Sequence, residues 1–257
     1  MPARASRGAP TPGVLPGYGE YEMNLENVLK AEIPSSFDRV TDAPLTQGNV
    51  QALPEGSKGA YLLFHKSVPV YAGKTDSRHG FQNRLTRHFH TLQHRKNVHI
   101  DDMSFKALRI AVFNIIDVEA ILISELRLRD PELLSWNFSG FGSNDPGRRR
   151  EGQVPAKFDK DFPIDIDKPL DEIRAGTYSF RELLGKVKEV VPYLLRYDID
   201  DTGQADLEVT IARDSPTMRD LMTMVVGSLR GVQATIFPGR VILYQERRQY
   251  EYATEQF

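Results

Sequence analysis

Two tyrosines, an arginine and a histidine have side chains whose types and spacing could support chemistry. Tyr61 and Tyr71 lie ten residues apart in the stretch GAYLLFHKSVPVYAG, and Arg84 and His88 follow, four residues apart. An arginine keeps its charge and offers a rigid fork of donors to an anion, whereas a histidine changes charge near neutral pH. A phenol, with an ordinary pKa of about 10, needs a neighbouring base or cation to release its proton. Together these groups could hold an anion and move a proton beside it.

A carboxylate follows on a predicted helix. Asp117 can cap a helix that runs through VEAILISELRLRD, and Glu119 falls in its first turn, on an otherwise apolar face. A carboxylate is costly to bury there unless something binds it, and one carboxylate suffices to hold Mg²⁺, which keeps several waters. Glu125 has Arg129 four residues on, which predicts an ordinary surface ion pair. This reasoning favours Glu119 as the ligand and leaves Glu125 as the alternative.

The tyrosines require a β-hairpin to bring them together. A short apolar run, a polar turn and a second apolar run are typical of one, with its loop at residues 66–68. The expected register sets Leu63 opposite Tyr71 and Tyr61 opposite Gly73. The two phenols would then be diagonal neighbours on one face of the hairpin.

Arg84 and His88 lie on a predicted helix at residues 78–93. Its apolar residues recur at helical spacing and predict a buried stripe, made of Phe81, Leu85, Phe89 and Leu92. Because they are four residues apart, Arg84 and His88 share a face along the rim of that stripe. Residues 106–116 then read as an apolar strand in the centre of a small sheet.

The order of these residues resembles the signature of the GIY-YIG nuclease superfamily. The matching positions are Gly59-x-Tyr61, Tyr71-x-Gly73, Arg84-x-x-x-His88, Glu119-x-x-Leu122-Ile123 and Trp136-Asn137. The continuation GFGSNDPG at residues 140–147 is similar to the loop of the type II restriction endonucleases of this superfamily, the group that includes enzymes cutting CCGCGG. The resemblance covers roughly residues 55–165.

The resemblance implies metal-dependent hydrolysis of DNA, with Mg²⁺ as the expected ion and Mn²⁺ as the alternative. It assigns catalytic roles to Tyr61, Tyr71, Arg84, His88, Glu119 and Asn137. In the family the first tyrosine contacts the nucleophile and a histidine assists, which implies these roles for Tyr61 and His88. Arg84 would clamp the scissile phosphate and Glu119 would hold the metal.

Two of these roles leave alternatives open. Tyr71 would hydrogen-bond the phosphate or hold the site, and Asn137 would position the phosphate or support the metal-bearing helix. The eighteen residues from Glu119 to Asn137 exceed the family's usual spacing by six, whereas Glu125 lies at the usual twelve. Glu125 therefore stays in consideration.

The distribution of charged residues along the sequence indicates where DNA could bind. The net charge is −2, so any attraction to DNA must come from local clustering. All six histidines lie between His65 and His99, basic residues outnumber acidic ones across residues 74–109, and the acidic excess lies mainly in residues 158–208. A basic half beside an acidic half favours a polyanion on one side. Candidate DNA contacts are Lys74, Arg87, His90, Asn144, Arg148, Arg149 and Arg150.

The remaining chain predicts a flexible arm at residues 1–20, a core at 21–165 and a C-terminal subdomain at 166–257. The core begins with a helix at 24–33 and a loop at 34–58. The subdomain would contain a helix at 179–196, a strand at 207–212, a helix capped by Ser215 with Pro216 at its first position, and a hairpin at 232–237 and 240–246. The expected fold is α+β, a mostly antiparallel sheet of about three strands flanked by helices, with an added C-terminal α/β layer.

These observations predict a site-specific deoxyribonuclease of the type II restriction class that acts on double-stranded DNA as a homodimer. The alternatives are a less specific GIY-YIG repair or mobile-element nuclease, and a catalytically dead DNA-binding protein on that fold. The chain has no long apolar run that would span a membrane and no secretory signal. The absence of cysteine excludes disulfides and fits a cytoplasmic protein.

Overall fold

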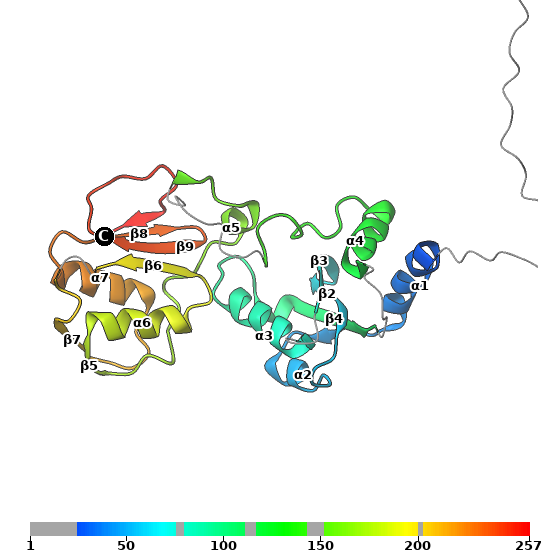
Figure 1. Ribbon diagram of the computed structural model, residues 1–257, viewed down its shortest axis with the longest axis horizontal. Coiled ribbons are helices and arrows are strands. Elements are labelled where there is room, and N and C mark those ends of the chain that lie inside the picture. Colours follow the sequence, from blue (N-terminus) through cyan, green and yellow to red (C-terminus); the bar gives the residue numbers. More distant parts are fainter. Residues whose placement is uncertain (1–24, 76–79, 111–116, 143–151, 200–202) are drawn as a thin grey trace, which may run out of the picture.

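The computed structural model describes residues 25–75, 80–110, 117–142, 152–199 and 203–257. They form two lobes side by side along the long axis of the molecule (Figure 1). We call residues 25–162 the N-terminal lobe and residues 163–257 the C-terminal lobe. Among the described residues, the N-terminal lobe contains one four-stranded sheet, and the C-terminal lobe contains a second four-stranded sheet and a separate two-stranded one.

The sheet of the N-terminal lobe is antiparallel and has the order β1-β4-β2-β3. Its strands are β1 (Ala43–Pro44), β2 (Gly59–His65), β3 (Val68–Lys74) and β4 (Met103–Arg109). The predicted hairpin register is confirmed, since Leu63 pairs with Tyr71 and Tyr61 with Gly73. The turn is shorter than expected: Lys66 and Ser67 both have positive φ, as a two-residue hairpin turn requires, and Val68 already belongs to β3.

Helices cover both faces of this sheet. They are α1 (Leu25–Arg39), α2 (Gln47–Gln51), α3 (Gly80–Gln93) and α4 (Val118–Arg129), with a 3₁₀ turn at Ile100–Asp102. Alternate residues of β2 face opposite sides: Tyr61 and Leu63 pack with α3, whereas Ala60 and Leu62 pack with α1 and α4. The sheet therefore brings its two tyrosines to the side that α3 covers.

Three boundaries in this lobe differ from the sequence prediction. α1 continues through Pro34 to Arg39, and the expected loop contains α2 and β1. The predicted central strand begins earlier, at Met103, because Met103 and Phe105 point into the core beside β2. β4 ends at Arg109, and residues 111–116 lie outside the described residues.

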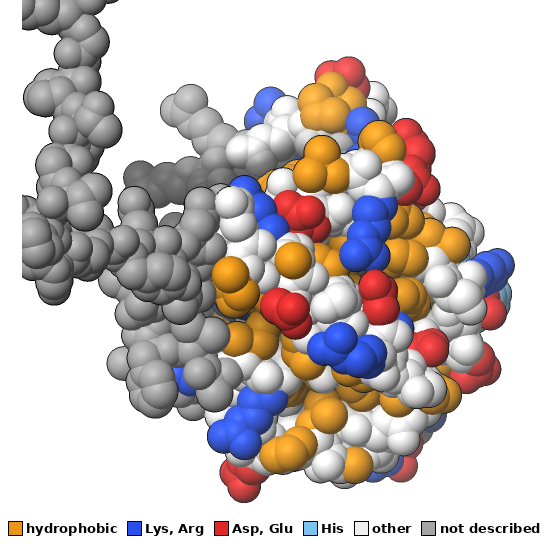
Figure 2. Space-filling model, turned by 90° about the vertical axis from the view of Figure 1, so that its right-hand side faces the viewer, with side chains coloured by type: hydrophobic (Ala, Val, Ile, Leu, Met, Phe, Trp, Pro, Cys, Tyr) orange, Lys and Arg blue, Asp and Glu red, His pale blue; other side chains and the backbone are white. Residues whose placement is uncertain are grey.

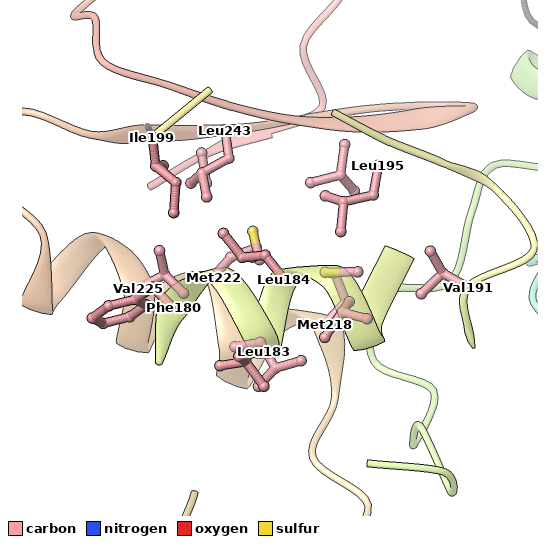
Figure 3. Close-up of a cluster of buried hydrophobic side chains, with 14 of the residues drawn as sticks. Phe180, Leu183, Leu184, Val191, Leu195, Ile199, Met218, Met222, Val225 and Leu243 are labelled. Carbon is pink, nitrogen blue, oxygen red and sulfur yellow. The ribbon is translucent and has the colours of Figure 1, made fainter. Parts of the chain in front are cut away.

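The C-terminal lobe packs two helices on one face of a second sheet, of order β10-β8-β9-β6. Its elements are β5 (Gly176–Ser179), α6 (Phe180–Val190), β6 (Leu194–Asp198), β7 (Glu208–Ile211), α7 (Met218–Ser228), β8 (Gln233–Phe237), β9 (Arg240–Tyr244) and β10 (Glu255–Gln256). Figure 3 shows the core between them: Leu184 and Met222 from the helices face Leu195 and Leu243 from the sheet. The predicted hairpin across 238–239 is confirmed.

Two predictions in this lobe are wrong. The predicted helix at 179–196 ends at Val190, because Pro192 cannot continue it, and residues 194–198 form β6, parallel to β9. The cap of α7 is Thr217, not Ser215: its hydroxyl accepts from the Asp220 amide while the Asp220 carboxylate accepts from the Thr217 amide. This reciprocal pair leaves no helix-capping role for Ser215.

The lobes are joined where α3 ends. The Asp165 amide donates to His94 O at 2.9 Å, and the Lys96 amide donates to Pro163 O at 2.8 Å. Lys168 Nζ donates to the carbonyl of Gln93, the last residue of α3, at 2.7 Å. Within the N-terminal lobe, Arg95 pairs with Asp159 of α5 (Lys157–Asp161) at 2.7 Å. The helix that carries Arg84 and His88 is thus fastened at its C-terminal end to the second lobe.

The predicted α+β class is confirmed, with helices on a mostly antiparallel sheet and an added C-terminal α/β layer. None of the helices in the described parts of the chain combines the length and the apolar character needed to cross a membrane.

Candidate active site

Tyr61 lies at the centre of the site on β2, with no exposed surface. Its ring lies over Gly73, where any Cβ would collide with the Tyr61 hydroxyl, which explains the glycine of the Tyr-x-Gly pattern. The Tyr61 hydroxyl lies 2.8 Å from His88 Nε2. Sheet and helix therefore meet in a direct tyrosine–histidine hydrogen bond.

His88 is buried, with 4% of its surface exposed. The sequence placed it at the rim of the helix's apolar stripe, whereas its ring contacts Tyr61, Tyr71 and Phe141. Burial, reinforced by the positive charges of Arg84 and Arg87, lowers the pKa of His88 to about 3. The imidazole is therefore neutral at physiological pH and can accept a proton or donate one, depending on its tautomer.

Tyr71 completes a three-ring cluster on β3. Its ring centroid lies 6.2 Å from that of Tyr61 and 5.3 Å from that of His88. Burial raises the pKa of both tyrosines, and the positive charge of Arg84, which is half-buried on α3, opposes that rise. Arg84 thus favours loss of the phenolic proton from both tyrosines, and the charge of Arg87 acts in the same direction on Tyr71.

Glu119 lies in the first turn of α4, and its charge acts on this cluster. Asp117 caps the helix as predicted, accepting from the Ala120 amide at 3.2 Å. The negative charge of Glu119 raises the pKa of both Tyr61 and Tyr71. Burial raises the pKa of Glu119 itself, and the charge of Asp117 adds to this effect.

Glu125, the alternative ligand, has no described interaction with the tyrosines or Arg84. The ion pair predicted between Glu125 and Arg129 is wrong, because Arg129 reaches across to Asp38 of α1 at 3.3 Å. Of the two glutamates, Glu119 is the one whose charge acts on the tyrosines.

The residues around Glu119 fit Mg²⁺ if water and phosphate supply most of the ligands of the ion. Among the described residues, no cluster of three or more His, Asp or Glu side chains could hold a metal ion. Glu119 would supply one carboxylate, and Mg²⁺ accepts such a site because water and phosphate oxygens complete its shell. A cation would also relieve the half-buried carboxylate, whose ionised form burial disfavours.

Asn137 is buried, and its side-chain amide forms hydrogen bonds with the backbone of β3. Its Oδ1 accepts from the Ala72 amide at 2.8 Å, and its Nδ2 donates to Ala72 O at 2.9 Å. The Leu134 and Trp136 amides bond in the same way to Pro69 O and Val70 O. This segment closes the free edge of the sheet beside Tyr71, which favours a positioning role for Asn137.

Sequence reasoning missed Phe141 and Gly142, which close the cluster. The Phe141 ring stacks on His88 with centroids 4.8 Å apart. Gly142 has φ +70°, and a Cβ there would lie 2.9 Å from the Tyr71 hydroxyl. The Gly-Phe-Gly pattern that begins the glycine-rich loop was the available signal for this close approach.

The candidate DNA contacts are only partly described. Lys74 pairs with Asp117 at 3.0 Å, whereas Arg87 and His90 are exposed on α3. Both line a cleft of about 730 Å³ between the lobes, which also borders His88. Asn144 and Arg148–Arg150 lie outside the described residues. At the α1 and α4 end, side chains of both charges are interspersed with hydrophobic ones (Figure 2).

Comparison with known proteins shows which family the central segment resembles. Residues 64–163 match the family model of the Eco29kI GIY-YIG domain, which belongs to a type II restriction endonuclease family. Comparison with curated proteins found no match. The matched segment carries Tyr71, Arg84, His88, Glu119 and Asn137 at the positions that the geometry brings together or supports. In sequence, residues 64–163 are therefore similar to the GIY-YIG domain of the Eco29kI family.

Proposed function

We propose that the protein is a Mg²⁺-dependent type II restriction endonuclease. It hydrolyses phosphodiester bonds of double-stranded DNA at a short palindromic site, as a homodimer. The observation that carries the proposal is the buried hydrogen bond between Tyr61 and His88, with Tyr71, Arg84 and Glu119 around it. A buried phenol and a neutral imidazole within reach of a cation and a carboxylate make a set suited to moving a proton beside a phosphate.

The Tyr61–His88 pair takes the proton from the attacking water. When the imidazole proton lies on Nδ1, the Tyr61 hydroxyl donates to Nε2, and the phenol oxygen can accept from the water as its own proton passes to His88. The depressed pKa of His88 keeps the imidazole neutral, so that a ring nitrogen can accept the proton, and it also makes the imidazole a weaker base than a free histidine. Arg84 stabilises the developing negative charge on the phosphate, and its charge also eases deprotonation of Tyr61.

Glu119 holds the metal ion. When bound, Mg²⁺ supplies charge neutralisation for the phosphate and the leaving oxygen. Glu119 is ionised more readily beside a cation than alone, because burial opposes its charge. Asn137 keeps β3, and with it Tyr71, in register with the rest of the site.

Two-fold assembly follows from a palindromic target, because a symmetric dimer presents the same surface to both half-sites. The weak net charge of −2 fits binding through a localised basic surface. Arg87 and His90 on the exposed side of α3 are the described candidates for it.

The test is digestion of a sequenced phage-sized DNA with Mg²⁺, for the parent and for the matched variants Glu119→Gln and Glu125→Gln. Discrete fragments from the parent and Glu125→Gln, but not from Glu119→Gln, are expected. Loss in Glu125→Gln alone would move the metal to that residue. A smear would favour a less specific nuclease, and DNA binding without cleavage under Mg²⁺ or Mn²⁺ would favour a dead nuclease fold.

A further inference from the structure

Phe141 touches two members of the site without carrying a reactive group. Its ring stacks on His88 at 4.8 Å with an interplanar angle of 25°, and meets Tyr71 edge-on at 5.1 Å. Trp136 and Phe158 also contact the Phe141 ring, with centroid distances of 5.1 and 4.7 Å. Phe141 is 5% exposed, so it fills the space beside His88.

The ring also lies beside His88 in the wall of a cleft. His88, Phe141 and Gly142 line the cleft of about 730 Å³ between the lobes. That cleft is wide enough for water, and polar groups of both lobes face it, among them Arg87, His90 and Glu189. With the aromatic ring removed, water in the cleft would reach the imidazole.

The other groups around His88 do not stack on its imidazole ring as Phe141 does. Tyr61 from β2 and Tyr71 from β3 meet the ring at steep angles of 50° and 62°. Arg84 and Arg87 of α3 act on it through their charge. The stacked face therefore comes from Phe141 alone among the aromatic contacts that the structure describes.

We propose that Phe141 is a positioning residue of the nuclease site, which holds the His88 ring so that Nε2 stays on the Tyr61 hydroxyl and which excludes cleft water from that pair. The proposal rests on the proposed function for its catalytic consequence. Its physical content, the orientation and desolvation of His88, stands independently. Burial is the main cause of the lowered His88 pKa, so opening this wall raises that pKa towards its ordinary value of about 6.5.

The first test uses NMR of the full chain labelled in its histidine rings. Phe141→Ala and Phe141→Leu are compared with Phe158→Leu, which disturbs the same aromatic cluster and the same cleft but does not stack on His88. Phe141→Leu keeps an apolar side chain and serves where Phe141→Ala does not fold. His88 is expected to titrate at higher pH in both Phe141 variants, whereas Phe158→Leu keeps the parent's behaviour.

The second test follows the pH dependence of single-turnover DNA cleavage. One pH unit below an ordinary pKa of about 6.5, about a tenth of the imidazole is neutral. If His88 is fully exposed in Phe141→Ala, the cleavage rate of this variant should therefore fall about tenfold between pH 8 and pH 5.5. This fall comes in addition to any acid loss of rate that the parent shows through Glu119. Phe141→Leu should show a smaller loss of the same form. In Phe158→Leu, any loss of cleavage rate relative to the parent should be the same at every pH.

Parallel His88 titrations in Phe141→Leu and Phe158→Leu would overturn the proposal, whatever the nuclease result. A shifted His88 titration in a protein that cuts no DNA would instead uphold the positioning role and reject the proposed function. The two failures are therefore distinguishable.

Discussion

The two lobes treat buried tyrosine hydroxyls differently. Tyr61 in the N-terminal lobe is fully buried and bonded to His88 at 2.8 Å. Tyr193 in the C-terminal lobe also has a buried hydroxyl, but it has no hydrogen-bond partner among the described residues. Buried polar groups that are joined in a hydrogen-bond network make a core more rigid and better defined. This difference favours the N-terminal lobe as the location of the proposed chemistry.

The cores of the lobes differ in the same way. The main core of the C-terminal lobe is nearly all aliphatic and methionine (Figure 3), closed by helices with reciprocal caps. The core of the N-terminal lobe under α3 includes both site tyrosines, with His88 and Asn137 buried beside it. Polar and titratable side chains are buried in and beside this core of the N-terminal lobe, as expected where a site is built into a core, whereas the main core of the C-terminal lobe is apolar.

Of the changes considered, Arg84→Ala should have the largest effect on the cleavage rate. Losing a preorganised cation beside the phosphate is expected to lower the cleavage rate by about 1000-fold, with little change in the free energy of unfolding. The measurement is single-turnover cleavage of a duplex that contains the site. Arg87→Ala, one turn along and exposed, is the matched control: it should weaken binding in a salt-dependent way and leave the saturated rate within about tenfold. Equal losses in the two variants would contradict the assignment.

Asn137→Ala should be the most destabilising of the site changes. It leaves the Ala72 amide and carbonyl without their side-chain partners, at a cost of about 2–3 kcal/mol in the free energy of unfolding. Denaturant unfolding checks this against Asn83→Ala, an exposed position on α3 that should change stability by under about 0.5 kcal/mol. A neutral Asn137→Ala variant would show that β3 does not need this support.

His88 should make the protein sensitive to acid. Its pKa is about 3 in the folded protein and about 6.5 when unfolded, so unfolding takes up a proton in that interval. Its contribution to the free energy of unfolding therefore falls by about 1.4 kcal/mol per pH unit below pH 6.5. The difference between the parent and His88→Gln across pH 4–6.5 measures this term, with His90→Gln as the control on the exposed side of the helix. A pH-independent difference would mean that His88 is not desolvated.

Thr217→Ala should have the smallest effect. Removal of the α7 cap costs about 1 kcal/mol, and the change lies in the lobe that carries no proposed catalytic residue. Thermal unfolding should shift, whereas the cleavage rate of the folded enzyme should not. A change in rate without a change in stability would show that the C-terminal lobe acts on the chemistry directly.

Much of this architecture could be predicted from the sequence. The hairpin register followed from strand alternation and correctly paired Tyr61 with Gly73, and Asp117 marked the start of α4. Both are local rules, in which neighbouring residues decide the outcome.

The rest depends on contacts between distant segments. Helical spacing could place His88 beside Arg84, but not show that residues 140–142 bury it. Nothing local pairs Asn137 with Ala72, sixty-five positions away. β6 continues an amphipathic pattern after Pro192, and its strand state follows from parallel pairing with β9, which overrides local preference.

The most direct test of the account is single-turnover cleavage by Tyr61→Phe and Tyr193→Phe. Each variant removes one buried hydroxyl oxygen and keeps the ring. In the proposed mechanism Tyr61 relays the proton to His88, so Tyr61→Phe is expected to lose at least about 100-fold in rate while DNA affinity stays unchanged. Tyr193→Phe should cleave at the parent's rate with equal or greater stability, since its hydroxyl has no partner among the described residues. Cleavage by Tyr61→Phe at the parent's rate would contradict the central claim.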